Sequence, residues 1–172
     1  MSVIDTYKNL DSSNKFLVAF PFWLAVLFGL FYWGNYYSLS PIGECIDSAV
    51  RSIIMSILDS LLENPILGYD IVIDAKYRVV ITPECNGLIP YLMILSAIVA
   101  YPCKMRSKVL FALSSFFIFF VVNIIRLYVV VWVVNSYGSS AFYLVHDVGG
   151  NLLLIATGAV IFLTYLGMCS AK

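Results

Sequence analysis

Residues 109–134 read VLFALSSFFIFFVVNIIRLYVVVWVV, an apolar run interrupted by a single charge, Arg126. A hydrocarbon core about 30 Å thick is crossed by roughly 20 apolar residues of helix. The rest of the chain has the same character, since 62% of its 172 residues are hydrophobic and 12% are charged. Soluble domains have about 25% charged residues. We therefore expect an integral membrane protein.

Three further segments are apolar enough to form membrane helices, namely 16–35, 86–103 and 148–168. With 109–134 they predict an all-α polytopic membrane protein of about four transmembrane helices, organised as the single membrane domain 1–172. The net charge of zero leaves no basic face, so we expect no nucleic-acid partner. The lipid bilayer is the partner that this composition requires.

Six basic residues flank these segments: Lys8, Lys15, Lys104, Arg106, Lys108 and Lys172. Four spans place all six on one side, and basic residues collect on the cytoplasmic side of a membrane. We therefore expect both termini in the cytoplasm and the regions 36–85 and 135–147 outside. No small-x-small cleavage site follows the first span, so we interpret it as an uncleaved anchor.

The longer outer region predicts an amphipathic helix over 44–64 and a short β-hairpin over 69–82. In the helix, apolar residues recur at the three-four spacing of one face, and Asp47 and Arg51 are placed opposite. Such a helix either lies at the outer interface or packs on the spans. In the hairpin, two β-branched runs flank the polar residues 74–76.

Cys85 and Arg126 stand out within this topology. Cys85 lies between a predicted strand and an apolar helix, where the helix dipole and unpaired N–H groups favour the thiolate, and Gly87 permits a sharp bend. Arg126 lies inside a span, where a charge is costly unless it faces protein or water. Asn123 shares its helical face. The alternatives are an inert buried thiol and an arginine that reaches the headgroups.

His146, the single histidine, lies beside Asp147, either in the second outer region or in the first turn of the last helix. Histidine carries protons near neutral pH, and Asp147 could orient its ring or cap the following helix; a solvated loop histidine is the alternative. The predicted topology puts Cys85, Arg126 and His146 in one leaflet. A thiolate nucleophile, a histidine acid–base and an arginine that stabilises an oxyanion are the groups required for cysteine acyl transfer.

The residues Glu84-Cys85-Asn86-Gly87, Asn123-Ile124-Ile125-Arg126 and His146-Asp147, in this order, resemble the exosortase/archaeosortase family. The resemblance covers residues from about 70 to 165 and is to a compact member. It implies Cys85 as nucleophile and Arg126 and His146 as the other catalytic residues. Asn123 then has a supporting role, as do Asn86, Gly87 and Asp147. Asn86 departs from the family pattern, in which serine or alanine is more usual.

The resemblance implies a membrane cysteine transpeptidase of the prokaryotic cell (inner) membrane. Its substrates are exported proteins that end in a short motif, a transmembrane helix and a basic tail. The enzyme cleaves near the motif through a thioester acyl-enzyme and transfers the protein to an amine, a lipid or water. The site would face outward. No cofactor is expected, and one histidine without HExxH leaves no metal-ligand set.

Two other functions remain open. A non-catalytic membrane assembly subunit would need no thiol, but it gives no reason for Arg126 inside a span. A membrane thiol oxidoreductase would use paired cysteines, whereas the four cysteines include no CxxC. A disulfide between Cys45 and Cys85, both predicted outside, is conceivable and would silence the nucleophile. Cys103 and Cys169 are predicted near the cytoplasmic face.

Overall fold

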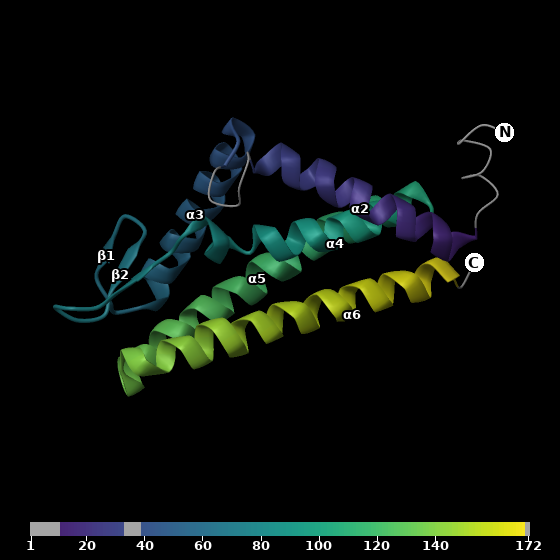
Figure 1. Ribbon diagram of the computed structural model, residues 1–172. Helices are drawn as coiled ribbons and strands as arrows, with labels where there is room; N and C mark the ends of the chain where they lie inside the picture. Colours follow the sequence, from purple (N-terminus) through teal and green to yellow (C-terminus); the bar gives the residue numbers. More distant parts are fainter. Residues whose placement is uncertain (1–10, 33–38, 171–172) are drawn as a thin grey trace.

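The computed structural model describes residues 11–32 and 39–170 (Figure 1). In chain order the elements are α2 (Ser12–Phe31), α3 (Pro41–Leu61), β1 (Ile66–Leu67), β2 (Asp70–Val72), β3 (Arg78–Val80), the 3-10 turn η1 (Pro83–Asn86), α4 (Leu88–Ala100), α5 (Met105–Tyr137), the 3-10 turn η2 (Ser139–Ala141), the π-helix η3 (Tyr143–Gly150) and α6 (Asn151–Ser170). This confirms the predicted fold class of a mostly helical membrane protein with a small strand region.

Within the described residues, three helical segments are long and apolar enough to cross a membrane: Ser12–Phe31, Met105–Tyr137 and Ser139–Cys169. The helix α4 has 13 residues, so it is about 20 Å long, less than the hydrocarbon core. It is shorter than the predicted span 86–103 for local reasons. Gly87, which precedes the helix, has a left-handed backbone, and Tyr101, which follows the helix, is extended, as a residue before proline prefers to be.

The other predicted segments differ from the observed helices mainly at their ends. The segment 16–35 corresponds to α2, and its residues 33–35 lie outside the described chain. The segment 148–168 falls within a longer helical stretch, because the predicted outer loop 135–147 is largely wound into η2 and η3. The predicted amphipathic helix 44–64 corresponds to α3, which begins at Pro41 behind the N-cap Ser40.

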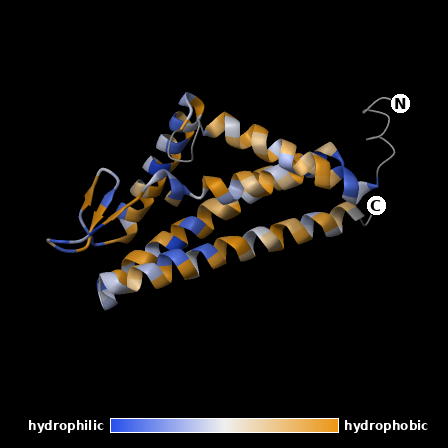
Figure 2. Cartoon of the chain, viewed as in Figure 1, coloured by the Kyte–Doolittle hydropathy of each residue, from blue (hydrophilic) through white to orange (hydrophobic). Residues whose placement is uncertain are grey.

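The helix α4 occupies the centre of the bundle, where it packs against α2, α5 and α6 (Figure 1). Hydrophobic residues cover most of these four helices, whereas hydrophilic residues are frequent on α3 and the strands (Figure 2). Figure 1 also shows that α3 crosses the direction of the other helices at one end of the bundle. The strands and α3 therefore form a cap over that end.

The apolar stripe of α3 packs on the protein. Val50, Ile54 and Leu58 join one buried cluster with Ile71 and Val79 of the strands, and residues of α5 complete it. Of the two arrangements that the sequence allows, packing on the spans is the one observed.

The position of Asp47 is a correction to the sequence prediction. Asp47 is expected on the polar face of the amphipathic helix, yet it is buried together with Val50 and Ile54 on the inner face of α3. A periodicity of apolar residues alone gives no signal for a buried carboxylate.

The predicted hairpin over 69–82 is present, with one more strand. β2 and β3 pair antiparallel with Ile71 opposite Val79, and β1 adds to the free edge of β2. The Asp74 side chain accepts hydrogen bonds from the backbone N–H groups of Lys76 and Tyr77 at 2.7 and 2.9 Å, which fixes the turn. β1 has only two residues, which is too short for the alternation of apolar and polar residues that predicts a strand. The sheet delivers the chain to η1.

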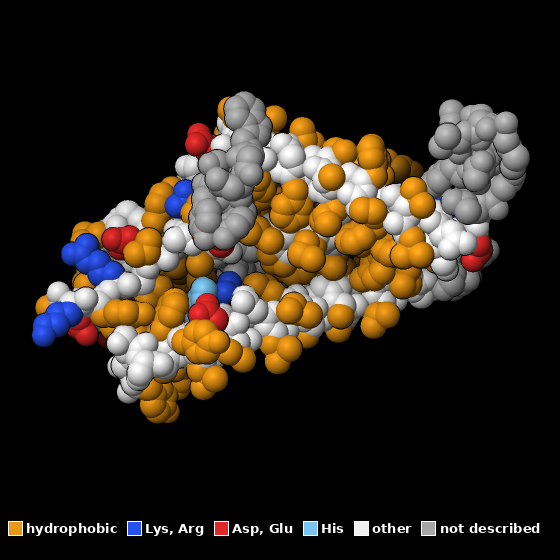
Figure 3. Space-filling view, viewed as in Figure 1, with side chains coloured by type: hydrophobic (Ala, Val, Ile, Leu, Met, Phe, Trp, Pro, Cys, Tyr) orange, Lys and Arg blue, Asp and Glu red, His pale blue; other side chains and the backbone are white. Residues whose placement is uncertain are grey.

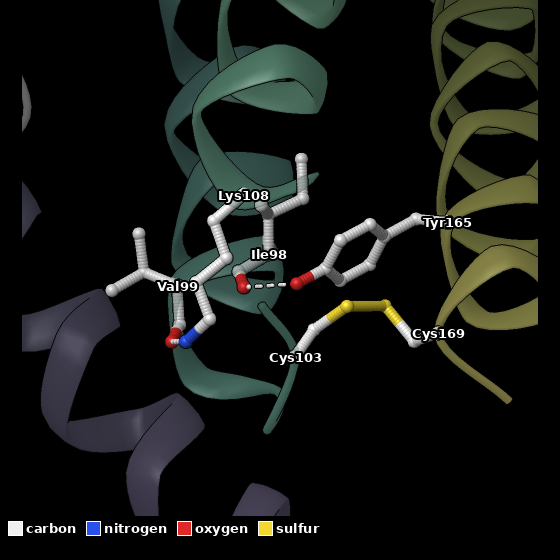
Figure 4. The surroundings of a disulfide bond; sticks show 6 residues. All are labelled: Ile98, Val99, Cys103, Lys108, Tyr165 and Cys169. Atoms are coloured by element: carbon white, nitrogen blue, oxygen red, sulfur yellow. Dashed lines mark hydrogen bonds between the residues drawn. A yellow bond between two sulfur atoms is a disulfide. The ribbon is translucent and has the colours of Figure 1, made fainter. Parts of the chain in front are cut away.

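The opposite end of the bundle is joined by a disulfide between Cys103 and Cys169 (Figure 4). Beside it, the Tyr165 hydroxyl donates to the Ile98 carbonyl at 3.0 Å. Cys45 and Cys85 are both free thiols, so the conceivable disulfide between them is not formed. The C-terminal ends of α4 and α6 are therefore held together.

Candidate functional site

Cys85, Arg126 and His146 meet where α3 and the strands cover the bundle. The Cys85 Sγ lies 3.5 Å from His146 Nε2, and Arg126 Nη2 lies 3.2 Å from the same nitrogen. They come from η1, α5 and η3, three separate elements. The structure thus brings together all three residues that the sequence singled out as catalytic candidates. On the face in Figure 3, charged side chains gather mainly near this end of the molecule.

The Cys85 segment is held by backbone contacts on both sides. The Cys85 N–H donates to the Thr82 carbonyl at 2.9 Å, and the Cys85 carbonyl accepts from Asn123 Nδ2 at 2.7 Å. Gly87 turns the chain into α4 with a φ of 80°, a conformation that other residues rarely adopt. A side chain at Gly87 would also press on Asn123. Asn123 and Gly87 therefore fix the backbone of the Cys85 segment.

The environment of the Cys85 sulfur favours its ionised form. Burial opposes ionisation, since the residue is only 8% exposed, but hydrogen bonds with His146 and with the Thr82 hydroxyl at 3.4 Å outweigh it. Together with the charge of His146 they lower the pKa of the Cys85 thiol. The activating contacts come from side chains, and Thr82, three residues before the cysteine, is a contributor that sequence reasoning missed.

Arg126 points into the protein. It is 5% exposed, and it donates to the His146 carbonyl at 3.3 Å and to Asn123 Oδ1 at 3.4 Å. Its Nε–H is buried without a hydrogen-bond partner among the described residues. A side chain at Gly150 would overlap that nitrogen, so Gly150 makes room for the guanidinium. The snorkelling alternative for Arg126 is therefore wrong.

His146 is oriented by Asp147, its neighbour on η3, and by Phe142, which lies between η2 and η3. Its Nδ1 lies 2.7 Å from Asp147 Oδ1, which is the orienting contact anticipated for this pair. Its ring stacks on Phe142 with centroids 4.7 Å apart and planes inclined by 11°. These contacts direct Nε2 toward the sulfur of Cys85. A π-helix is rare and often marks a functional site. Phe142 lies four residues before His146, and residues at this spacing are neighbours on a helix, so the sequence did hold a signal for this contact.

Asn86 does not face the sulfur. Its Nδ2 donates to Asp47 of α3 at 2.5 Å, and its Oδ1 accepts from the Leu88 N–H at 2.7 Å. Its supporting contact is therefore with α3 and with the first turn of α4. Asp47 was missed as a member of the site because the sequence places it among exposed charges.

A cavity of about 500 Å³ reaches Arg126, one of the three residues, whereas Cys85 and His146 do not line it. Glu84 and Arg126 line its polar end, and its other walls are mainly apolar. Those walls are Ile89, Pro90, Met93 and Ile94 of α4, Phe119 of α5, and Asn151, Leu154, Ile155, Gly158 and Ala159 of α6. The cavity therefore follows α4 and α6 away from the site and leaves out their disulfide-linked ends.

The site combines a nucleophile with an acid–base group and a cationic hydrogen-bond donor. A thiol of lowered pKa, an imidazole within reach of it and a guanidinium with an unused donor suit attack on a carbonyl group. Among residues 11–32 and 39–170, no group of three or more His, Cys, Asp or Glu residues could hold a metal ion.

We predict that Cys85 reacts with thiol reagents at a lower pH than an ordinary cysteine. Its lowered pKa means that the thiolate persists above that value and is lost as the pH falls through it. In a Cys45→Ser background, the alkylation rate of Cys85 should titrate with a midpoint below 9.0, the ordinary value. His146→Ala should move the midpoint upward, because it removes the contact that stabilises the thiolate. An unchanged midpoint would contradict the pairing.

Comparison with known proteins identifies the family. The model of a family described as transmembrane exosortase matches residues 13–163. No curated protein and no solved structure matches the chain. The matched range takes in α4, α5 and η3 together with the three residues of the candidate site. The chain therefore belongs to the transmembrane exosortase family.

Proposed function

We propose that this protein is a membrane cysteine transpeptidase or protease that cleaves the C-terminal sorting signal of exported proteins. The observation that carries the proposal is the contact of the Cys85 sulfur with His146 Nε2 at 3.5 Å, with Arg126 Nη2 3.2 Å from the same nitrogen. Membership of the exosortase family supports it. Cys85 is the nucleophile, His146 the acid and base, and Arg126 the electrophilic group.

In the first half-reaction, the Cys85 thiolate attacks the carbonyl carbon of the scissile amide. The oxygen of the tetrahedral intermediate becomes negative and accepts hydrogen bonds from Arg126, whose buried Nε–H has no other partner among the described residues. His146 gives its proton to the leaving nitrogen, the carbon–nitrogen bond breaks, and a thioester to Cys85 remains. The cleaved C-terminal segment departs as a free amine.

In the second half-reaction, an amine or water attacks the thioester. His146 now takes the proton of the attacking group, and the carbon–sulfur bond breaks. The exported protein leaves on its acceptor, and the Cys85 thiolate and protonated His146 return. The Asp147 carboxylate stabilises the imidazolium in both halves, because it lies 2.7 Å from Nδ1.

The cavity supports the proposed substrate class. A sorting signal carries an apolar helix directly after its cleavage motif, and the cavity offers an apolar wall along α4 and α6 that begins at Arg126 and Glu84. A substrate helix that enters from the bilayer would place its motif beside Cys85. Gly158 lets α6 lie close to α4 at this wall, since a Cβ at this position would meet the Ile94 side chain at about 3.0 Å.

The proposed mechanism predicts the behaviour of four variants in cells that co-express an exported protein ending in a motif, an apolar helix and a basic tail. Cys85→Ala should abolish its cleavage. Arg126→Ala and His146→Ala should each slow cleavage by about 10²-fold or more, the usual cost of an oxyanion donor or a general acid–base. Cys45→Ser, the matched control at the other free thiol, should cleave normally.

Immunoblotting of the substrate in each strain gives the readout. Normal processing by Cys85→Ala would overturn the proposed function. Loss of processing in Cys45→Ser would instead favour the thiol oxidoreductase, which needs both free cysteines. Processing that depends on the protein but on none of the three residues would favour the assembly subunit.

We propose further that the site faces the outside of a prokaryotic cell membrane and that both termini are cytoplasmic. In support, α2 begins and α6 ends at the same end of the bundle (Figure 1), and the basic residues Lys104, Arg106 and Lys108 lie there, at the N-cap and in the first turn of α5. The Cys103–Cys169 disulfide argues in the opposite direction, because most cytosols keep thiols reduced. The orientation therefore calls for a direct test.

A membrane-impermeant maleimide added to intact cells provides that test. In a Cys85→Ala background, Cys45 is the remaining free thiol of the described chain, and it is exposed. We expect labelling of Cys45 without permeabilisation and none in the Cys45→Ser control. Labelling that appears only after permeabilisation would place α3 and the site in the cytoplasm.

A further inference from the structure

We propose that Asp47 is a positioning residue, which through Asn86 holds the Cys85 segment at the distance from His146 that reaction requires. The kinetic consequences of this assignment rest on the proposed function, whereas its effect on thiol reactivity does not. Asp47 lies on the amphipathic helix α3, outside the motifs that carry Cys85, Arg126 and His146.

The first support is the burial and bonding of the Asp47 carboxylate. Asp47 is 1% exposed, and a buried carboxylate is retained only when its charge and its lone pairs are satisfied. One oxygen accepts from Asn86 Nδ2 at 2.5 Å. The other pairs with Arg51, one helical turn later, at 2.8 Å to Nε and 2.5 Å to Nη2. The charge is therefore neutralised within α3, and the remaining oxygen is directed at the cysteine segment.

The second support is the identity of residue 86. The Asn86 side chain carries a donor and an acceptor on separate atoms, so it can join two groups at once. Its amide nitrogen reaches Asp47, and its amide oxygen accepts from the Leu88 N–H at 2.7 Å. That N–H is in the first turn of α4, where backbone donors have no partner within the helix. Asn86 thus ties α3 to the start of α4.

Arg51 holds the other end of the same segment. Its Nη1 donates to the Ile81 carbonyl at 3.4 Å, and its guanidinium lies 4.1 Å from the centre of the Tyr69 ring. One turn of α3 therefore contacts the chain before Cys85, at residue 81, and after it, at residue 86. Asn123 holds the Cys85 carbonyl from α5. The cysteine backbone is fixed from both directions.

This fixation matters because the contact that it controls is long. The Cys85 sulfur lies 3.5 Å from His146 Nε2, so a small shift of the segment is enough to break the pair. A displacement of about 1 Å at a reacting group can cost on the order of 10²-fold in rate. Loss of Asp47 should therefore reduce the reactivity of Cys85, although Asp47 does not touch the sulfur.

The test compares Asp47→Ala with the exchange variant Asp47→Asn/Asn86→Asp and with Asp59→Asn, an exposed acidic residue of the same helix. Each is made in the Cys45→Ser background, and the rate of Cys85 alkylation at pH 7 is measured in detergent. We expect Asp47→Ala to be slower by about tenfold or more. The exchange variant, which restores a donor opposite a carboxylate, should recover most of the rate, and Asp59→Asn should match the parent.

A double-mutant cycle with Asn86→Ser tests the same bond in variants that keep a small polar residue at position 86. We expect Asn86→Ser alone to slow alkylation and Asp47→Asn to add little to it, because the two side chains act as a unit. Independent effects of the two changes, an unaltered rate in Asp47→Ala, or no recovery by the folded exchange variant would each overturn the proposal. The cycle remains informative where Asp47→Ala does not fold.

Cleavage of a co-expressed substrate provides the second readout. We expect Asp47→Ala to lower kcat with little change in KM, since Asp47 does not line the cavity that would take the substrate helix. If no variant, including the parent, cleaves any such substrate but alkylation follows the predicted order, the proposed function fails and the positioning role stands. A change confined to KM would contradict the positioning role.

Discussion

The burial of one guanidinium inside a membrane-spanning helix is the constraint on which the rest of the structure depends. A charge within the bilayer costs several kcal/mol unless protein surrounds it. Arg126 meets this requirement by pointing into the bundle, where Asn123 and a carbonyl of η3 accept its hydrogen bonds. The chain must therefore bring η3 close to α5, and Gly150 must leave room for the side chain. The same contacts place His146 beside the guanidinium.

The cysteine is brought to this centre from the other side by the cap of α3 and the strands. The cap buries an apolar cluster against α5, and its polar contacts through Asp47 and Arg51 fasten the segment that carries Cys85. Apolar burial thus determines where the cap sits, and a few buried polar bonds determine where the sulfur sits. Together, the apolar burial and the polar bonds allow a short membrane chain to hold three reactive groups close together.

Sequence reasoning reached the fold class and the three central residues because both leave strong local signals. Apolar runs reveal the spans, and Arg126 is conspicuous inside one of them. It missed the role of Asp47, since a buried carboxylate and a solvated one look alike in a helical pattern. It left His146 open between the outer loop and the first turn of the last helix, because no simple residue pattern marks a π-helix. The Cys103–Cys169 disulfide joins residues 66 apart, a proximity that only the packed helices create.

Detection of the covalent acyl-enzyme would test the central claim most directly. Membranes containing the protein and an exported substrate would be quenched in acid, and the peptide that contains Cys85 would be examined by mass spectrometry. The account predicts a substrate fragment joined to the Cys85 sulfur and released by hydroxylamine, as a thioester would be. Substrate cleavage that proceeds without an adduct on Cys85, or with the fragment attached to another residue, would contradict it.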